Sequence, residues 1–164
     1  MTNKIKKKEQ EMILKSLNKN KLELNFIKIS GEKDLLERSY LVFLNRKKNT
    51  RISSKDKLSF KDHCHFVKNH PYRLWYLIEF KGLLMASIYF KFDNTLGLNF
   101  LSFKKKIFIN IINLVLKVVK PLPKIDSVRP EFFIMNLASH NNKYKKILKD
   151  SGFKKIQETF SLAV

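Results

Sequence analysis

The spacing of apolar residues predicts an alternation of strands and helices. The apolar positions of segment 22–30 are those of a strand, and 33–45 carries apolar side chains at helical spacing. A polar stretch follows over 45–57 and is expected to be a loop. A short helix is then predicted over 59–69, because Ser59 can cap its start and Pro71 follows its end.

The middle of the chain predicts three consecutive strands. Segment 73–80 is almost continuously apolar, which is typical of a strand buried on both faces. Segments 83–92 and 95–103 follow after the short polar turns Lys81-Gly82 and Asp93-Asn94. Such short turns favour antiparallel neighbours.

Segment 105–120 contains many β-branched residues, but its polar positions favour a helix. Asn110, Asn113, Lys117 and Lys120 recur at intervals of three and four residues, as on one side of a helix. Further elements are a strand over 132–138, a helix over 142–150 and a strand over 153–162. The order predicts an α/β fold with a mixed, mostly antiparallel central sheet and helices on both faces.

Two regions of the chain differ in composition. Residues 1–22 are rich in lysine and asparagine with only a weak helical pattern, so they are expected to be a basic lead-in that is flexible or partly helical. Residues 23–164 are expected to form one folded domain, in keeping with a chain of 164 residues.

The formal net charge of +20 favours anionic partners, although a lysine-rich composition by itself could produce it. The lysines are dispersed and arginine is scarce, so direct nucleic-acid recognition is not favoured. Phosphate-bearing small molecules suit the same charge.

Several classes of site are excluded. The four glycines are too far apart for a P-loop or a dinucleotide fingerprint, and the single cysteine, Cys64, allows no intrachain disulfide. His63 and His65 would lie on different sides of a helix, so no metal site is expected. The longest apolar segment, 107–119, is too short and polar to span a bilayer, and no signal peptide is recognised, so a cytoplasmic location is expected.

The C-terminal third resembles the GNAT acetyltransferases. In that family an apolar strand leads to an asparagine, a short helix and a Gly-Phe turn, as Phe133–Ala138, Asn141 and Gly152-Phe153 do here. The order of elements over about 24–162 is also similar. The resemblance implies that acetyl-CoA is the co-substrate and that a backbone N–H of Leu98–Leu101 donates to its thioester carbonyl. The candidates for binding this cofactor are therefore Asn99, Phe100, Leu101 and Asn141. From the residues alone, Asn99 is equally a solvent-facing strand residue.

The front half resembles GNAT members that acetylate the amino group of a nucleotide-linked sugar in surface-glycan pathways. The residues that carry this resemblance are Arg46, Asn49, Arg51, Ser59 and His63. It implies that His63 faces the acceptor and that Arg46, Arg51 and His63 bind it. Arg129 joins them as a phosphate-binding candidate, since arginine suits diphosphates; a solvated loop arginine is the alternative.

The chain departs from the GNAT pattern at two places. Lys105, Phe108 and Asn110 stand where the family's pyrophosphate loop has its signature residues, two of them glycine or alanine. Either Lys104, Lys105 and Lys106 hold the pyrophosphate by charge with Phe108 beside it, or CoA binding has been lost. Leu148 replaces the family's proton-donating tyrosine.

Four residues are candidates for proton transfer, each with a structural alternative. His63 and His140 could act near neutral pH, and Glu79 could be a base, although an exposed or ion-paired glutamate fits it better. Tyr144 could replace the missing tyrosine, although helix packing explains it more simply. The function expected is N-acetylation of an amine on a nucleotide-linked sugar by direct attack on acetyl-CoA. The alternative is a non-catalytic GNAT-like module that binds an anionic partner such as RNA or an acidic membrane, and a homodimer stays open.

Overall fold

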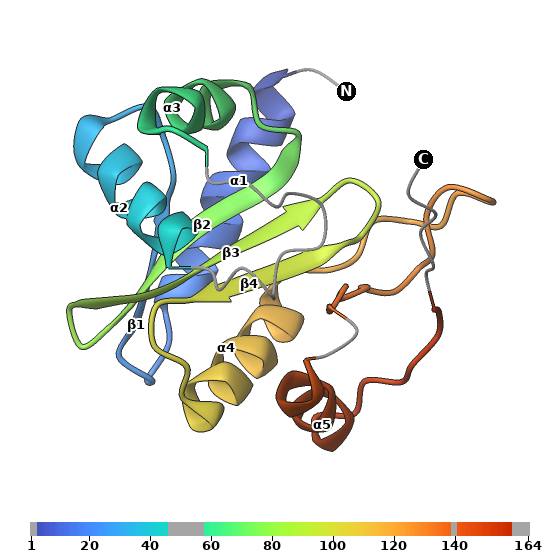
Figure 1. Ribbon diagram of the computed structural model, residues 1–164. Helices are drawn as coiled ribbons and strands as arrows, with labels where there is room; N and C mark the ends of the chain where they lie inside the picture. Colours follow the sequence, from blue (N-terminus) through green and yellow to red (C-terminus); the bar gives the residue numbers. More distant parts are fainter. Residues whose placement is uncertain (1–2, 46–57, 139–140, 159–164) are drawn as a thin grey trace, which may run out of the picture.

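The computed structural model describes residues 3–45, 58–138 and 141–158 and places a four-stranded antiparallel sheet at the centre of the protein (Figure 1). The strands lie side by side in sequence order, so each is joined to its neighbour. They are β1 (Leu24–Lys28), β2 (Tyr72–Phe80), β3 (Leu83–Lys91) and β4 (Leu96–Phe100).

Helices cover both faces of this sheet, as the hydrophobic pattern predicts. α2 (Lys33–Leu44) and α3 (Phe60–Asn69) cover one face, where Trp75 and Leu77 of β2 point toward them. α1 (Asn3–Asn18) and α4 (Lys105–Val118) cover the other, and α5 (Asn142–Asp150) lies beyond α4 (Figure 1). The α/β class is therefore confirmed.

Local signals in the sequence account for several element boundaries. The Ser59 hydroxyl accepts a hydrogen bond from the Asp62 N–H (3.1 Å) and caps α3, while His70, before Pro71, is already extended. The β2–β3 turn is formed by Lys81 (φ 53°) and Gly82 (φ 76°). Two successive residues with positive φ match the turn type that suits the twist of a hairpin.

The expected mixed sheet is corrected at its C-terminal end. No described residue of 132–138 or 153–158 belongs to a strand, and residues 159–162 lie outside the described part. Among the described residues, the only parallel pairing is an isolated bridge between Thr95 and Ile134. Phe133 and Met135 instead pack on the core. The alternating apolar residues of this segment are therefore partly buried, although the segment forms no ladder of strand hydrogen bonds.

The N-terminal segment is a helix docked on the sheet rather than a mere lead-in. Leu17 of α1 is completely buried. The Asn18 side chain exchanges two hydrogen bonds with the backbone of Phe26, at 3.0 and 2.7 Å, on the free edge of β1. α1 thus covers one face of the core and supplies hydrogen-bond partners to the backbone of β1, which is an edge strand of the described sheet.

Candidate functional site

The outer edge of β4 is where the sheet opens. The Leu96 N–H donates to the Ile134 carbonyl (2.8 Å), and the Ile134 N–H donates to the Asn94 carbonyl (3.0 Å). Beyond this bridge, residues 135–138 make no backbone hydrogen bond to β4 in the described part of the chain. Two segments that start as parallel neighbours therefore part after one pair, and most of this edge is unpaired.

The register of β4 decides which N–H groups face the opening. The Lys91 N–H bonds the Thr95 carbonyl, and the Leu101 N–H bonds the Met85 carbonyl, so the backbone groups of Thr95 and Leu101, two odd-numbered residues that flank β4, point toward β3. Because the direction alternates along a strand, the N–H groups of Leu98 and Phe100 point to the open edge.

This register gives the N–H groups of the three residues expected to contact a cofactor, Asn99, Phe100 and Leu101, different directions. Asn99 is paired with Ser87, so its N–H belongs to the ladder with β3, and the Leu101 N–H is also bonded there. Neither can serve as the open backbone donor. Phe100 keeps an outward N–H, while its carbonyl accepts from the Asn45 side chain (3.4 Å).

Four aromatic rings gather beside the open edge. Phe103 lies between Phe100 (5.3 Å between centroids), Phe108 (5.9 Å) and Tyr144 (4.6 Å). Phe108 is completely buried, so it cannot contact a pyrophosphate as expected; its helical position faces the core instead. Burial raises the pKa of Tyr144 to about 12, and its hydroxyl therefore stays protonated at neutral pH.

The N-terminus of α4 adjoins this aromatic cluster and is strongly basic. Lys104 precedes the helix without a side-chain cap, and Lys105 and Lys106 form its exposed first turn. The Lys105 ammonium lies 3.1 Å from the Asp150 carboxylate at the end of α5. Free N–H groups, the helix dipole and two further lysines make this end attractive to anions.

Asn141 directly precedes α5 and caps its N-terminus. Its side-chain oxygen accepts from the Tyr144 N–H at 3.5 Å, and its carbonyl accepts from the Lys145 N–H at 3.1 Å. This fits the asparagine, helix and Gly-Phe arrangement, with Gly152 at φ 87° after the helix. A direct contact between Asn141 and a cofactor would have to use its remaining amide N–H groups.

His63 is placed in the core and not on an acceptor surface. It is 2% exposed, and its Nε2 lies 2.8 Å from the Ser39 hydroxyl oxygen. Because that hydroxyl donates to the Leu36 carbonyl (3.0 Å), it must accept the proton of His63 Nε2. Burial lowers the pKa of His63, so the ring is a neutral structural group that a substrate cannot reach directly.

Glu79 is ion-paired, as expected if it has a structural role and is not a catalytic base. Its carboxylate accepts from Arg38 of α2 and, at 2.8 Å, from the Asn25 amide of β1. It lies on the α2 side of the sheet, near the β2–β3 turn. The structure does not bring it to the open edge of β4.

Arg129 also has a structural task. Its guanidinium donates to the carbonyls of Pro123 (2.7 Å) and Phe92 (2.8 Å) and so ties the loop after α4 to the β3–β4 turn. These two bonds use Nε and one Nη1 proton of the five guanidinium N–H groups, so the side chain is held by the backbone, away from the open edge of β4. The remaining candidates, Arg46, Arg51 and His140, lie outside the described residues.

The arrangement therefore gathers only part of the expected site. Phe100 and Tyr144 come together through Phe103, and the lysines at the start of α4 follow the same strand, whereas His63, Glu79 and Arg129 lie elsewhere. Within the described chain no three metal-ligating side chains cluster, and no helix is long and apolar enough to cross a membrane. No protein-family model matches the chain, and no curated protein or solved structure matches it either.

Proposed function

We propose that the protein transfers an acetyl group from acetyl-CoA to an amine, with an amino sugar linked to a nucleotide as acceptor. The observation that carries the proposal is the single parallel bridge between Thr95 and Ile134, after which the edge of β4 is unpaired. This supplies an outward N–H at Leu98, on the strand that leads into the basic N-terminus of α4. The order of elements from β1 to α4 and the cap at Asn141 are among the features that the GNAT resemblance implies.

In this proposal each group has one task. The Leu98 N–H donates to the thioester carbonyl, where negative charge develops during attack. The amine nitrogen forms a bond to the carbonyl carbon, the carbon–sulfur bond breaks, and the amine loses one proton. The leaving sulfur takes up a proton, for which the Tyr144 hydroxyl, protonated at neutral pH, is the candidate donor, and Lys104 and Lys106 attract the phosphates.

One observation favours a second candidate, a non-catalytic module that binds an anionic partner through its lysines. The rings of Phe100, Phe103 and Tyr144 fill the space beside β4, and Phe108 supports them from the core. The two candidates differ in whether acetyl-CoA binds.

Isothermal titration calorimetry with acetyl-CoA separates the two candidates. Saturable binding of acetyl-CoA is expected for the transferase. Desulfo-CoA and ATP are the comparison ligands. The Leu98→Pro variant removes the outward N–H but no bond to β3, so it should fold and lose most of its transfer activity. Asn99→Pro removes a ladder N–H and should lower the unfolding temperature. No binding of acetyl-CoA, or full activity in Leu98→Pro, would refute the proposal.

A further inference from the structure

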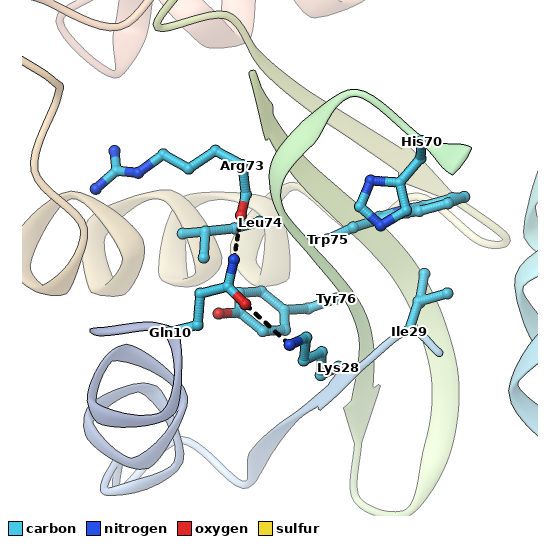
Figure 2. Close-up of a pocket in the computed structure, with 8 residues that line it drawn as sticks. All are labelled: Gln10, Lys28, Ile29, His70, Arg73, Leu74, Trp75 and Tyr76. Atoms are coloured by element: carbon cyan, nitrogen blue, oxygen red, sulfur yellow. Dashed lines mark hydrogen bonds between the residues drawn. The ribbon is translucent and has the colours of Figure 1, made fainter. Parts of the chain in front are cut away.

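A cavity lies at the opposite edge of the sheet, where β1 ends before its neighbour β2. The last regular pair joins Lys28 to Tyr76, and the Ile29 N–H still donates to the Trp75 carbonyl (3.1 Å). The start of β2 therefore has no strand on this side. The Gln10 side chain of α1 takes that place and donates to the Arg73 carbonyl at 2.9 Å (Figure 2).

The cavity between α1, the end of β1 and the start of β2 has a volume of about 130 Å³. This is room for a small molecule or a few waters. Its polar lining is contributed by Gln10, Lys28, His70, Arg73, Trp75 and Tyr76.

Two of these residues carry buried donors that lack a partner. The Tyr76 side chain is 1% exposed, and its hydroxyl makes no hydrogen bond to any residue that the structure describes. The same holds for the indole N–H of Trp75, which is 9% exposed. Figure 2 shows the hydroxyl end of Tyr76 directed toward the Gln10 side chain. A buried polar group without a partner costs about 1–3 kcal/mol, so such a group calls for a bound partner from outside the chain.

The other polar groups are donors as well. The Lys28 ammonium uses one proton to bond the Gln10 side-chain oxygen at 2.9 Å and has two left. His70 Nδ1 accepts from the Tyr72 N–H (3.1 Å), so the neutral ring carries its proton on Nε2 and donates from there.

Acceptors are correspondingly scarce. The side-chain oxygen of Gln10 is already bonded, and none of the residues lining the cavity is acidic. The carboxylate of Glu9 is 3.1 Å from the Arg73 guanidinium and is occupied there. A ligand that fits this lining must bring oxygen acceptors, and the positive charge of Lys28 favours one that is anionic.

We propose that this cavity binds a small oxyanion, a phosphate or carboxylate group, whose oxygens accept hydrogen bonds from the Lys28 ammonium and the Tyr76 hydroxyl. His70 and Trp75 border the same cavity, and the His70 ring can add a further donor to its lining. The site is formed by β1, β2 and α1, whereas the proposed acetyl-CoA edge belongs to β4. Either site can therefore exist without the other.

The test is titration of the full chain with inorganic phosphate and, separately, acetate, with chloride added to hold the ionic strength constant. Saturable binding of either anion is expected, followed by calorimetry or by the amide NMR signals of Lys28 and Tyr76. Tyr76→Phe and Lys28→Met should each weaken it at least tenfold. Lys33→Met, which removes an exposed lysine of α2, is the matched control and should bind like the wild type.

The variants also report on the free protein. Tyr76→Phe removes a hydroxyl without a partner, so without anion its unfolding temperature should equal or exceed that of the wild type. Binding of phosphate alone identifies a phosphate site, and binding of acetate alone a carboxylate site. The proposal is overturned if neither anion saturates, if Lys33→Met weakens binding as much as Lys28→Met, or if Tyr76→Phe binds as tightly as the wild type.

Discussion

His63 of α3 donates a hydrogen bond from Nε2 to the Ser39 hydroxyl of α2 across 2.8 Å, and both side chains are buried. The rings of Tyr40 and Phe43 flank the imidazole at centroid distances of 5.2 and 5.8 Å. The contact joins two helices on one face of the sheet. It makes His63 part of the packing there, although its sequence position had suggested a substrate contact.

Ser39→Ala should destabilise the protein, because it leaves the His63 N–H buried without an acceptor. We expect a loss of about 1–3 kcal/mol in the free energy of unfolding, measured by urea denaturation. An unchanged midpoint would mean that the imidazole bonds elsewhere. Ser102→Ala, at an exposed position outside this helix contact, is the comparison and should change little.

Stability should fall as the pH is lowered below about 6.5, the ordinary pKa of histidine. Burial lowers the pKa of His63 in the folded state, so between that value and 6.5 the unfolded chain binds more protons. His70 contributes with the same sign, since burial and Lys28 lower its pKa. Melting temperatures at about pH 7.5 and 5.5 should differ less in His63→Gln than in the wild type. An equal difference would contradict this assignment.

Gly97→Ala should be destabilising for a steric reason. A Cβ at this position would lie 2.1 Å from the ring of Tyr89, which stacks on Tyr72 at a centroid distance of 4.4 Å. Overpacking of this kind costs about 1–3 kcal/mol. A double-mutant cycle is the check, because Gly97→Ala should cost much less in a Tyr89→Ala background; equal costs in both would rule out the steric cause.

Asn94 should hold the loop after α4 in place. This fully buried side chain donates to the carbonyls of Leu122 (2.9 Å) and Pro130 (2.7 Å) and accepts from the Leu122 N–H (2.8 Å). Its φ of 64° is one that glycine tolerates, so Asn94→Gly removes the bonds without adding strain. We expect a loss of about 2–4 kcal/mol and faster proteolysis between 122 and 130. Unaltered proteolysis would contradict the role.

Leu17→Ala should cost about 2–5 kcal/mol, because this α1 side chain is wholly buried against the sheet. Met12, on the same helix but 58% exposed, provides the control. Met12→Ala should change the unfolding free energy by less than about 0.5 kcal/mol. Equal, small effects would mean that α1 does not dock.

The elements from 24 to 118 could be predicted closely from the sequence. The periodicity of hydrophobic residues, the Ser59 cap and the Lys81-Gly82 turn are local features. The strands and helices that they predict agree with those of the structure to within a few residues at each end. α4 was predicted in spite of its β-branched residues, because Asn110, Asn113 and Lys117 mark one polar side of a helix.

The candidate site could be predicted much less well. That Asn99 lies in a strand follows from pattern, but whether its N–H points to β3 or to the open edge depends on register. Likewise Glu79 meets Arg38 only because β2 and α2 pack together, 41 residues apart in sequence. These are long-range relationships that no local pattern encodes.

The sequence by itself determined the helix and strand segments, the charge and the absence of glycine-rich phosphate loops, since each depends on neighbouring residues alone. The tertiary structure decided that segment 132–138 pairs with the sheet edge at Ile134 and otherwise packs on the core, that α1 covers a core face, and that Gln10 reaches the start of β2. The physical reason is that pairing and burial depend on what lies opposite in space. A segment can have the same apolar pattern whether it pairs with a neighbouring strand or packs on a hydrophobic surface.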